Sequence, residues 1–514
     1  MNRPLIHGVL MFVSLSAVTL LTDRVSAQRE GAVLESGYEI AYATYLGGAA
    51  WDQAREIIPQ SDGTVLVGGM TSSSNMPATP GVVQPAYAGD DPSLGHGGVF
   101  GGDAFLVRLS PDGEKILTAT YFGGSKQERG VYGMLLDSRG NIVIGSATRS
   151  PDMPTTRGSF QPKYGGGQAD MYAAKLTPDM KRILWCTYIG GSRTDWPRGG
   201  LALDREDNVY LVGGTDSDNF PVTEGAFRRE RKGERDAAVV KLSADGSELL
   251  LATLLGGSSW DGLMGIQVDG NGSVYVAGHT QSPDLPVTPG TPQSKFAAKS
   301  DCFLAKLSSS GSRLVYSTYL GGRENEFAEH RPWLGADGTF LLTGVTSSPD
   351  FPTTAGAFQT TLNGKNDGFV TKVAADGKSF VFSTLLGGSS GGEFFLMPTP
   401  DRDGNIFVVG HSTSADFPVT SDALQSTFRG GGKPNDGDGV LAVLSPDGSR
   451  LLYATYVGGS GDDLIRSVAL GPHGELYLVG STASADFPAT SHAVQTKLAG
   501  NADAFVVKLV PRRR

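Results

Sequence analysis

Short hydrophobic runs alternate with turns rich in Asp, Gly, Pro and Ser along most of this chain. One such run ends in Gly-Gly and occurs seven times, with its threonine at Thr44, Thr120, Thr187, Thr253, Thr318, Thr384 and Thr455. Successive threonines are 76, 67, 66, 65, 66 and 71 residues apart, so the chain repeats a unit of about 66 residues. A fixed period of this length indicates a repeat architecture.

A second hydrophobic run, which begins with Asp, keeps the same period and starts at Asp103, Asp170, Asp236, Asp301, Asp367, Asp438 and Asp503. Each of the first six copies leads through a tight turn, such as 110–113 (SPDG), into the next Gly-Gly run, which is typical of a β-hairpin. Two further runs lie between each Gly-Gly and the next Asp run, separated by turns such as 137–141 (DSRGN). We therefore predict four antiparallel strands per unit. Runs such as Phe505-Val506-Val507 are apolar on both faces, as expected of sheets packed between neighbours.

Seven four-stranded sheets around one axis form a β-propeller, so we predict an all-β fold with seven blades. An open stack of sheets is the alternative. The seventh unit has no Gly-Gly run after its Asp run because the chain ends at Arg514, whereas residues 39–48 carry such a run with no unit before them. We expect this N-terminal strand to complete the last blade, which would remove exposed sheet edges.

The first residues differ from the repeats. Arg3 precedes an apolar run from Val9 to Leu21, and Val25-Ser26-Ala27 then forms a small-residue cleavage pattern, which is typical of a secretory signal peptide. The run is too short for a comfortable transmembrane span. The predicted organisation is a signal peptide over 1–27, a short linker over 28–37, a single propeller over 38–510 and a basic tail over 511–514.

Composition narrows the class of partner. A hydrophobic fraction of 39% with 19% charged residues is ordinary for a soluble globular protein. The net charge of −10 argues against nucleic acid or an anionic membrane as partner, because phosphate binding needs a basic stripe. The two cysteines, Cys186 and Cys302, occupy different positions in non-adjacent units, which favours two buried free thiols over a disulfide.

Four elements recur in a fixed order: T-Y-L-G-G-S, G-N-I-Y-V-x-G, T-x-S-x-D-F-P-x-T and D-A-F-V-x-K-L. This combination resembles the SBBP repeat of bacterial seven-bladed propeller proteins, from about Tyr38 to Leu509. The resemblance implies the fold and an exported bacterial protein. It carries no catalytic residue to this sequence.

Strand order places the short Asp/Gly turns on one side of the ring. The opposite side, the long-loop face, carries the Gly-Gly links between blades and connections of about twenty residues, and such loops are the usual place for binding. The long connections repeat the pattern [TS]-x-S-x-[DN], whose oxygens at alternate positions could ligate Ca²⁺. The candidate ligands are Asp152, Asp284, Asp350, Asp416 and Asp486, and Asn replaces Asp in two further copies. The structural alternative is that these oxygens accept hydrogen bonds from backbone N–H groups in turns.

Each innermost strand is predicted to begin with an acid: Asp52, Glu128, Asp195, Asp261, Glu326, Glu393 and Asp463. Seven equivalent acids favour a shared structural role over a ring of reactive carboxylates at the channel mouth. Aromatic residues and arginines near these acids differ between blades, and such side chains suit a carbohydrate or peptide site. The predicted ligand-binding residues are Trp51, Arg55, Trp196, Arg198, Trp260, Phe327, Arg331 and Arg466. The alternative is that the aromatics wedge between blades and the charges are solvated.

Catalytic motifs are scarce. The G-x-S-x-G match at 387–391 lies in a link between blades and not between a strand and a helix, so it is not a nucleophile elbow. The fifth link, 323–333 (RENEFAEHRPW), supplies the catalytic candidates Glu326, Glu329 and His330 as general acid or base.

Three functions remain open from the sequence. The first is an exported, non-enzymatic scaffold that binds an extracellular ligand, carbohydrate or protein, on its long-loop face. The second is a polysaccharide hydrolase or lyase with its site at the channel mouth, and the third is a purely structural cell-surface module. We expect a monomer that is secreted, periplasmic or at the cell surface, without a membrane span after signal cleavage and without a cofactor, calcium being the one alternative.

Overall fold

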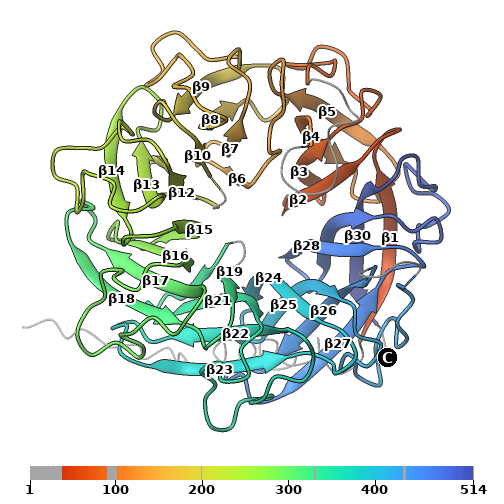
Figure 1. Ribbon diagram of the computed structural model, residues 1–514. Helices are drawn as coiled ribbons and strands as arrows, with labels where there is room; N and C mark the ends of the chain where they lie inside the picture. The colour runs from red at the N-terminus through yellow and green to blue at the C-terminus, as the bar shows by residue number, and fades with distance from the viewer. Residues whose placement is uncertain (1–36, 90–100, 198–199, 329–330, 432–435, 513–514) are drawn as a thin grey trace, which may run out of the picture.

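The computed structural model describes residues 37–89, 101–197, 200–328, 331–431 and 436–512. Within these ranges the regular elements are β-strands, and they form seven small antiparallel sheets around a central axis (Figure 1). The predicted all-β, seven-bladed propeller is confirmed. The predicted signal peptide and nearly all of the linker lie outside the described residues. No helix in the described part of the chain is long and apolar enough to span a membrane.

The strands of the first three blades run in chain order from the axis outward. The first blade contains β2 (Asp52–Pro59), β3 (Val65–Thr71), β4 (Asp103–Leu109) and β5 (Ile116–Phe122). The second contains β6 (Gly133–Leu136), β7 (Ile142–Thr148), β8 (Asp170–Leu176) and β9 (Ile183–Ile189). The third contains β10 (Asp195–Trp196), β11 (Leu201–Leu203), β12 (Val209–Thr215), β13 (Asp236–Leu242) and β14 (Leu249–Leu255).

The next three blades repeat this order. The fourth blade contains β15 (Asp261–Val268), β16 (Val274–Thr280), β17 (Asp301–Leu307) and β18 (Leu314–Leu320). The fifth contains β19 (Glu326–Ala328), β20 (Trp333–Leu334), β21 (Phe340–Thr346), β22 (Asp367–Val373) and β23 (Phe380–Leu386). The sixth contains β24 (Glu393–Pro400), β25 (Ile406–Ser412), β26 (Asp438–Leu444) and β27 (Leu451–Val457).

The seventh blade joins the two ends of the chain. It contains β28 (Asp463–Leu470), β29 (Leu476–Thr482), β30 (Asp503–Pro511) and, outermost, β1 (Tyr38–Leu46). β1 pairs with β30 in a register that runs from Tyr38 opposite Pro511 to Leu46 opposite Ala504. The predicted closure by the N-terminal strand is therefore confirmed, and β30 extends one residue past the predicted end of the propeller.

The hydrophobic core lies between neighbouring blades. Between the seventh and first blades, for example, Val479 and Val506 pack with Val67 and Phe105, and all four side chains are buried. Both faces of each sheet are covered in this way, which explains why the strands are apolar on both faces. Cys186 and Cys302 are buried in such seams as free thiols, as predicted.

A turn glycine in the first blade receives a ring from the closing strand. Gly113 has a φ of 73°, and a Cβ added there would lie 2.4 Å from the ring of Tyr42 in β1. Both its left-handed backbone and this close approach require glycine. The turn at Gly113 thus packs against Tyr42 at the seam between the seventh and first blades, where the two ends of the chain meet.

The innermost strands depart from regular geometry near the long-loop face. In four blades a β-bulge falls at the third residue after the opening acid, namely Arg55, Met264, Leu396 and Arg466. In the third and fifth blades the innermost strand is in two pieces, and Pro197 and Pro332 border the breaks. Proline has no N–H to donate to the neighbouring strand, so it interrupts the innermost strand. A bulge changes the direction of the side chain at that position. Both features therefore change which side chains of the innermost strand point toward the channel.

We expect the closing strand to be needed for a soluble fold. A chain that starts at residue 47 lacks the buried Tyr42 and Tyr45 and leaves the edge of β30 unpaired. Loss of a buried aromatic side chain alone costs about 3–5 kcal/mol. Size-exclusion chromatography and thermal unfolding, compared with a chain that starts at residue 28, should show aggregation and a lower Tm. A synthetic peptide of residues 38–48 should partly restore the monomer, and equal Tm values for the two chains would contradict the closure.

Candidate functional site

The acid that opens each innermost strand is buried beneath the Gly-Gly link. Asp52 is 0% exposed, and its Oδ2 accepts hydrogen bonds from the Gly48 N–H and the Ser73 hydroxyl, each at 2.8 Å. Its Oδ1 accepts from the Thr71 hydroxyl. Each equivalent acid in the other blades accepts two or three hydrogen bonds from the matching hydroxyls and, except for Glu128, from the matching link N–H; these acids are Glu128, Asp195, Asp261, Glu326, Glu393 and Asp463. These hydrogen bonds hold the link against the strands below it, so they indicate a structural role for the acids.

Glu326, a catalytic candidate from the sequence, makes these same contacts. It is 0% exposed, and it accepts hydrogen bonds from the Thr346 hydroxyl at 2.7 Å and the Gly322 N–H at 2.9 Å. The structure thus holds this carboxylate inside the seam between blades. Glu329 and His330, the other two candidates, lie outside the described residues.

Both glycines of the link are required by the packing around this acid. A Cβ on Gly47 would lie 2.6 Å from Asp52 Oδ2 and 2.9 Å from Asp503 Oδ1. A Cβ on Gly48 would lie 2.5 Å from Asn75 Oδ1 and 2.6 Å from Ser73 Cβ. These distances are shorter than van der Waals contact, so a larger residue would push the link away from the acid. The Gly-Gly run and the [TS]-x-S-x-[DN] pattern therefore recur together because they pack on each other.

Two buried carboxyl groups flank the first glycine of each link. The pairs are Asp503 with Asp52, Asp103 with Glu128, Asp170 with Asp195, Asp236 with Asp261, Asp301 with Glu326, Asp367 with Glu393 and Asp438 with Asp463. Burial raises the pKa of Asp170, Asp301 and Asp463 to about 7, and that of Asp52 and Asp195 to about 6. Water is excluded from these groups, so the neutral acid is favoured over the anion.

The five candidate calcium ligands also cap the links. Each of Asp152, Asp284, Asp350, Asp416 and Asp486 accepts a hydrogen bond from the backbone N–H that follows a Gly-Gly, at 2.7–3.0 Å. Asn75 and Asn219 accept the same bond at 2.8 Å, so the role does not need a negative charge. Ca²⁺ takes six to eight oxygens, and no group of three or more His, Cys, Asp or Glu side chains in the described ranges could hold a metal. These residues therefore do not fit a calcium site.

Aromatic rings and guanidinium groups alternate at the long-loop mouth of the channel. The Arg55 guanidinium lies 4.1 Å from the ring centre of Tyr132, and that of Arg129 lies 4.8 Å from the same ring. Arg129 also lies 5.3 Å from the ring centre of Trp196. These separations are within the range of cation–π attraction. A ladder of planar groups thus links the first three blades.

The ladder continues into the fourth and fifth blades. The Arg235 guanidinium lies 5.7 Å from the ring centre of Trp196 and 5.4 Å from that of Trp260. Trp260 stacks on His279 at 4.7 Å, and His279 meets the ring of Phe327 edge-on at 5.3 Å. Phe327 is 39% exposed, so the ladder ends at the surface.

Arg331 crosses the channel from the fifth blade. Its guanidinium donates to Glu56 of β2 at 2.7 Å and to the backbone oxygen of Met134 in β6 at 3.1 Å. Burial raises the pKa of Glu56 to about 7, which the positive charges of Arg331 and Arg55 oppose. The contact ties three blades together across the axis.

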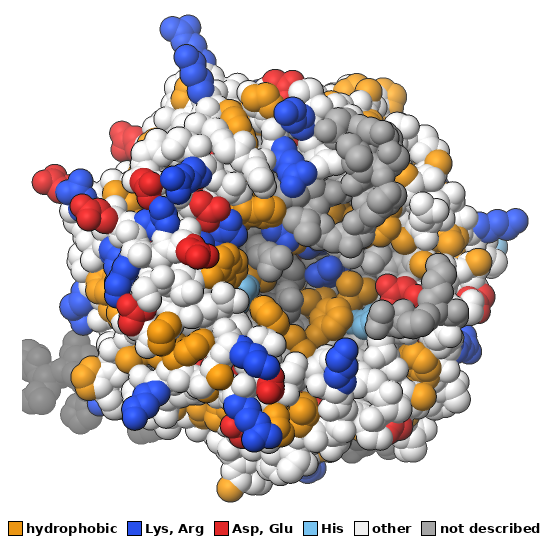
Figure 2. Space-filling view, in the orientation of Figure 1, with side chains coloured by type: hydrophobic (Ala, Val, Ile, Leu, Met, Phe, Trp, Pro, Cys, Tyr) orange, Lys and Arg blue, Asp and Glu red, His pale blue; other side chains and the backbone are white. Residues whose placement is uncertain are grey.

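A hollow opens beside the ladder between the third and fourth blades. It is shallow and open to solvent, has room for about one water molecule, and is lined by Trp196, Gly214, Arg235, Trp260, Gly262, Leu263 and Met264. Figure 2 shows the long-loop face, which is hollowed at its centre and has hydrophobic side chains around the hollow. This is the apolar, concave surface that ligand sites commonly use.

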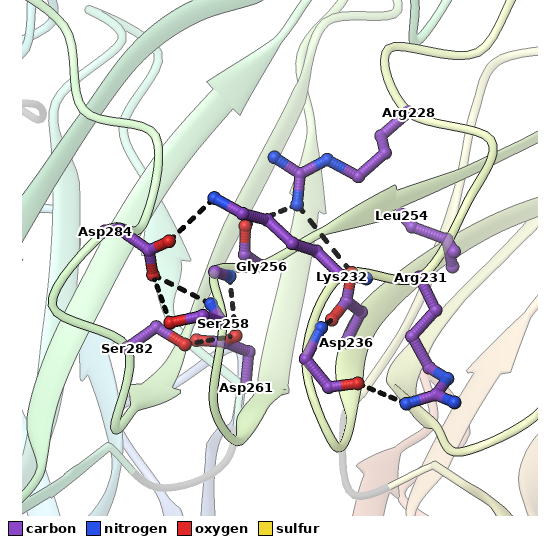
Figure 3. A network of polar contacts seen from close by, with 12 residues as sticks. Arg228, Arg231, Lys232, Asp236, Leu254, Gly256, Ser258, Asp261, Ser282 and Asp284 are labelled. Carbon is purple, nitrogen blue, oxygen red and sulfur yellow. Dashed lines mark hydrogen bonds and ion pairs between the residues drawn. The ribbon is translucent and has the colours of Figure 1, made fainter.

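Ion pairs link charged side chains of the third blade, and Figure 3 shows one of them, between Lys232 and Asp284 of the fourth blade. Arg235 pairs with Asp216 through two hydrogen bonds, at 2.6 Å from Nε and 2.7 Å from the second nitrogen. Lys232 pairs with Asp284 at 2.7 Å, which lowers the pKa of Asp284 to about 2. Arg231 pairs with Asp218 at 2.5 Å. Arg235, Lys232 and Arg231 therefore each pair with a different carboxylate.

The structure brings together most of the predicted ligand-binding residues, but not all. Trp196, Trp260, Phe327 and Arg55 belong to the ladder, and Arg331 lies across the channel. Trp51 lies at the seam of the seventh and first blades, where it bridges Ala502. Arg466 is the bulged residue of β28, and Arg198 lies outside the described residues.

Sequence reasoning missed four members of the ladder, namely Arg129, Tyr132, Arg235 and His279. Arg129 follows the acid Glu128 directly, as Trp196 follows Asp195, so its position in the repeat was a usable signal. Arg235 precedes the Asp run of the third unit, where most other units have a small residue or an amide. Its contact with both tryptophans required the tertiary structure.

Because at least one carboxyl group of each pair has a raised pKa in the fold, we expect stability to fall with rising pH. An acid with a raised folded pKa contributes stability that is complete below its unfolded value, near 4, and lost as the pH rises through about 6–7. The Tm should therefore decrease between about pH 5 and pH 8. Asp170→Asn should flatten this decrease, whereas the exposed Glu230→Gln should not. A Tm that increases over this range would contradict the assignment.

Residues 184–221 match the family model described as SBBP, a β-propeller repeat. No curated protein matches this chain in sequence. Among solved structures, a protein of unknown function from Dyadobacter fermentans is 12% identical with a TM-score of 0.39, over 93% of this chain and 100% of that chain. The quinohemoprotein alcohol dehydrogenase from Comamonas testosteroni is 11% identical with a TM-score of 0.40, over 95% of this chain and 78% of that chain. At these TM-scores neither structure informs the activity of this chain.

The matched segment begins in β9 and extends through the third blade as far as Pro221, and the same elements recur in each of the seven blades. The chain is thus a seven-bladed β-propeller, and one segment of it matches the SBBP β-propeller repeat.

Proposed function

We propose that this protein is an exported propeller scaffold that binds an extracellular ligand, carbohydrate or protein, on its long-loop face. The signal-peptide pattern of residues 1–27 supports export. The observation that carries the binding role is the hollow at the channel mouth, with two tryptophans and an arginine in its wall. Aromatic area for packing and a few fixed polar groups are the usual composition of such sites.

The ladder gives this site a fixed shape before any ligand arrives. Arg235 is held by Asp216 and lies near two indole rings, and Trp260 is stacked on His279. Side chains held on both sides lose little freedom when a ligand binds, so less of the interaction energy is lost to ordering. The fixed side chains at the mouth of the channel are therefore suited to binding a ligand.

Binding is favoured over polysaccharide cleavage by the state of Glu326. A general acid or base must reach the substrate within hydrogen-bond distance. The carboxylate of Glu326 is 0% exposed and accepts bonds from Thr346 and Gly322 inside the seam. Its six counterparts make the same type of contact, which is what a structural role predicts.

We expect the purified protein to bind at least one component of an array of extracellular polysaccharides and proteins. Trp260→Ala should weaken that binding about tenfold or more, equivalent to about 1.4 kcal/mol, because it removes a wall of the hollow. Leu117→Ala changes an exposed side chain on the outermost strand of the first blade and should leave binding unchanged. Surface plasmon resonance on the array hits measures both variants, and circular dichroism checks their folding.

A native protein that binds nothing on either array would contradict the proposal. So would equal binding by the Trp260→Ala and Leu117→Ala variants.

A further inference from the structure

All seven seams between blades contain the same pair of buried carboxyl groups, but at one seam an arginine lies beside the pair. We infer that this difference makes the ring a pH-dependent device: six seams are closed by a proton that the carboxyl pair holds, whereas the charge of Arg228 replaces that proton between the third and fourth blades. Rising pH then loosens six seams and leaves this one closed. The device is independent of the ligand that the protein binds.

A glutamine of the long connection lies beside the carboxyl pair in six blades. Its side-chain oxygen accepts a hydrogen bond from the N–H of the first glycine of the link, at 2.8–3.1 Å. In five of these blades its amide nitrogen also donates to the Asp that opens the third strand. The six glutamines are Gln84, Gln161, Gln293, Gln359, Gln425 and Gln495. An amide is neutral, so it does not compensate the charge of an ionised pair.

Arg228 occupies this position in the third blade (Figure 3). A guanidinium group has no acceptor atom, so it contacts the link in the opposite sense and donates to the Gly256 carbonyl oxygen at 2.5 Å. The same nitrogen lies 3.7 Å from a carboxylate oxygen of Asp236, whose side chain is 0% exposed. Because arginine stays protonated throughout the ordinary pH range, this seam contains a permanent cation.

The pairs without an arginine bring acceptor atoms together. A Cβ on Gly123 would touch Glu128 Oε2 and lie 2.8 Å from Asp103 Oδ1, and neither oxygen accepts a hydrogen bond from another group in the described ranges. Three further pairs contain such an oxygen, on Asp170, Asp301 and Asp463. Two ionised carboxylates in a buried seam repel each other, and a proton on one of them removes this repulsion.

The pair between the third and fourth blades is satisfied without a proton. Asp236 accepts hydrogen bonds from the Lys232 N–H at 3.0 Å and the Gly233 N–H at 2.9 Å, one on each oxygen. Both oxygens of Asp261 also accept hydrogen bonds. These donors and the charge of Arg228 stabilise the ionised form, so this seam does not depend on a bound proton.

The pKa values agree with this difference. In each pair without an arginine, burial raises the pKa of one carboxyl group to about 7 for Asp103, Asp170, Asp301, Glu393 and Asp463, and to about 6 for Asp52. Burial also raises the pKa of Asp261, and the negative charge of Asp236 adds to this increase. Stability that depends on a raised pKa is complete near pH 4 and is lost as the pH rises through about 6–7.

Other titratable and charged groups lie near the pairs. Lys232 pairs with Asp284 across the third and fourth blades, but these side chains are 45% and 42% exposed, so water screens their charges. Burial raises the pKa of Tyr319, near Asp261, to about 12, so its hydroxyl stays neutral. Elsewhere, the negative charges of Asp216 and Asp350 act on Asp195 and Glu326, and the positive charges of Arg429 and protonated His411 act on Asp438.

Hydrogen exchange of the full propeller, measured by mass spectrometry at about pH 5.5 and about pH 8.5, tests this device. After correction for the intrinsic effect of pH on exchange, protection of the Gly-Gly links in six seams should fall about tenfold or more, because the ionised pair opens the seam. Protection of residues 255–261, the link between the third and fourth blades, should fall about threefold or less. Equal losses in all seven links, or no loss in any link, would overturn the inference.

Arg228→Gln gives the third blade the residue that the other six blades have. At about pH 5.5 it should change protection of residues 255–261 by about twofold or less, whereas at about pH 8.5 it should lower protection about tenfold. Arg229→Gln, the matched control, removes a charge from the adjacent exposed residue and should change protection about twofold or less at both pH values. An equal loss at both pH values in Arg228→Gln would mean that the arginine only fills space, which overturns the inference.

Gln293→Arg makes the reciprocal change in the fourth blade, beside Asp301 and Glu326, and it serves as the test if Arg228→Gln does not fold. The added cation should reduce the pH-dependent loss of protection in residues 320–326 to about threefold or less. The losses in the links of the other five seams should stay as they are in the native protein. An unchanged loss in residues 320–326 would contradict the role assigned to the arginine.

Discussion

The buried carboxyl group under each Gly-Gly link is the interaction on which the ring depends. In three blades it accepts hydrogen bonds from the link, from the second strand and from the long connection that follows, as Asp52 does from Gly48, Thr71 and Ser73, and in the others it makes two of these three bonds. One side chain thus fixes how the chain leaves one blade and enters the next. A second buried carboxyl group lies against the same glycine, and burial raises the pKa of acids such as Asp170.

This repeated joint explains why the molecule can vary beside it. The acid is fixed by its partners, but the next residue makes none of those hydrogen bonds and differs from blade to blade. Gln53, Arg129, Trp196, Gly262, Phe327, Phe394 and Leu464 occupy this position in successive blades. Seven equivalent acids cannot form one unique binding site, whereas the seven different residues that follow them can. The side chains that differ between blades therefore directly follow the acid that all blades share.

Rigidity at the mouth follows from the mixture of planar cations and rings. Arg129 and Arg235 each lie near two aromatic rings, and Arg331 spans the channel to Glu56. Cation–π contacts that are partly desolvated are stronger than exposed ones, so the buried part of the ladder holds its shape. The wall around Trp260 therefore has a fixed arrangement, since Trp260 lies near Arg235 and stacks on His279.

The sequence by itself determined the period, the four strands per unit, the number of blades and the closing role of the first strand, because turns and apolar runs are local signals. It also fixed which acids recur, and their repetition indicated a structural role. It did not show that Arg235 lies between Trp196 and Trp260, that a bulge turns Arg55 toward Tyr132, or that Arg331 reaches Glu56 from 275 residues away. Those contacts join different blades, and only the closure of the ring brings such distant residues within reach of each other.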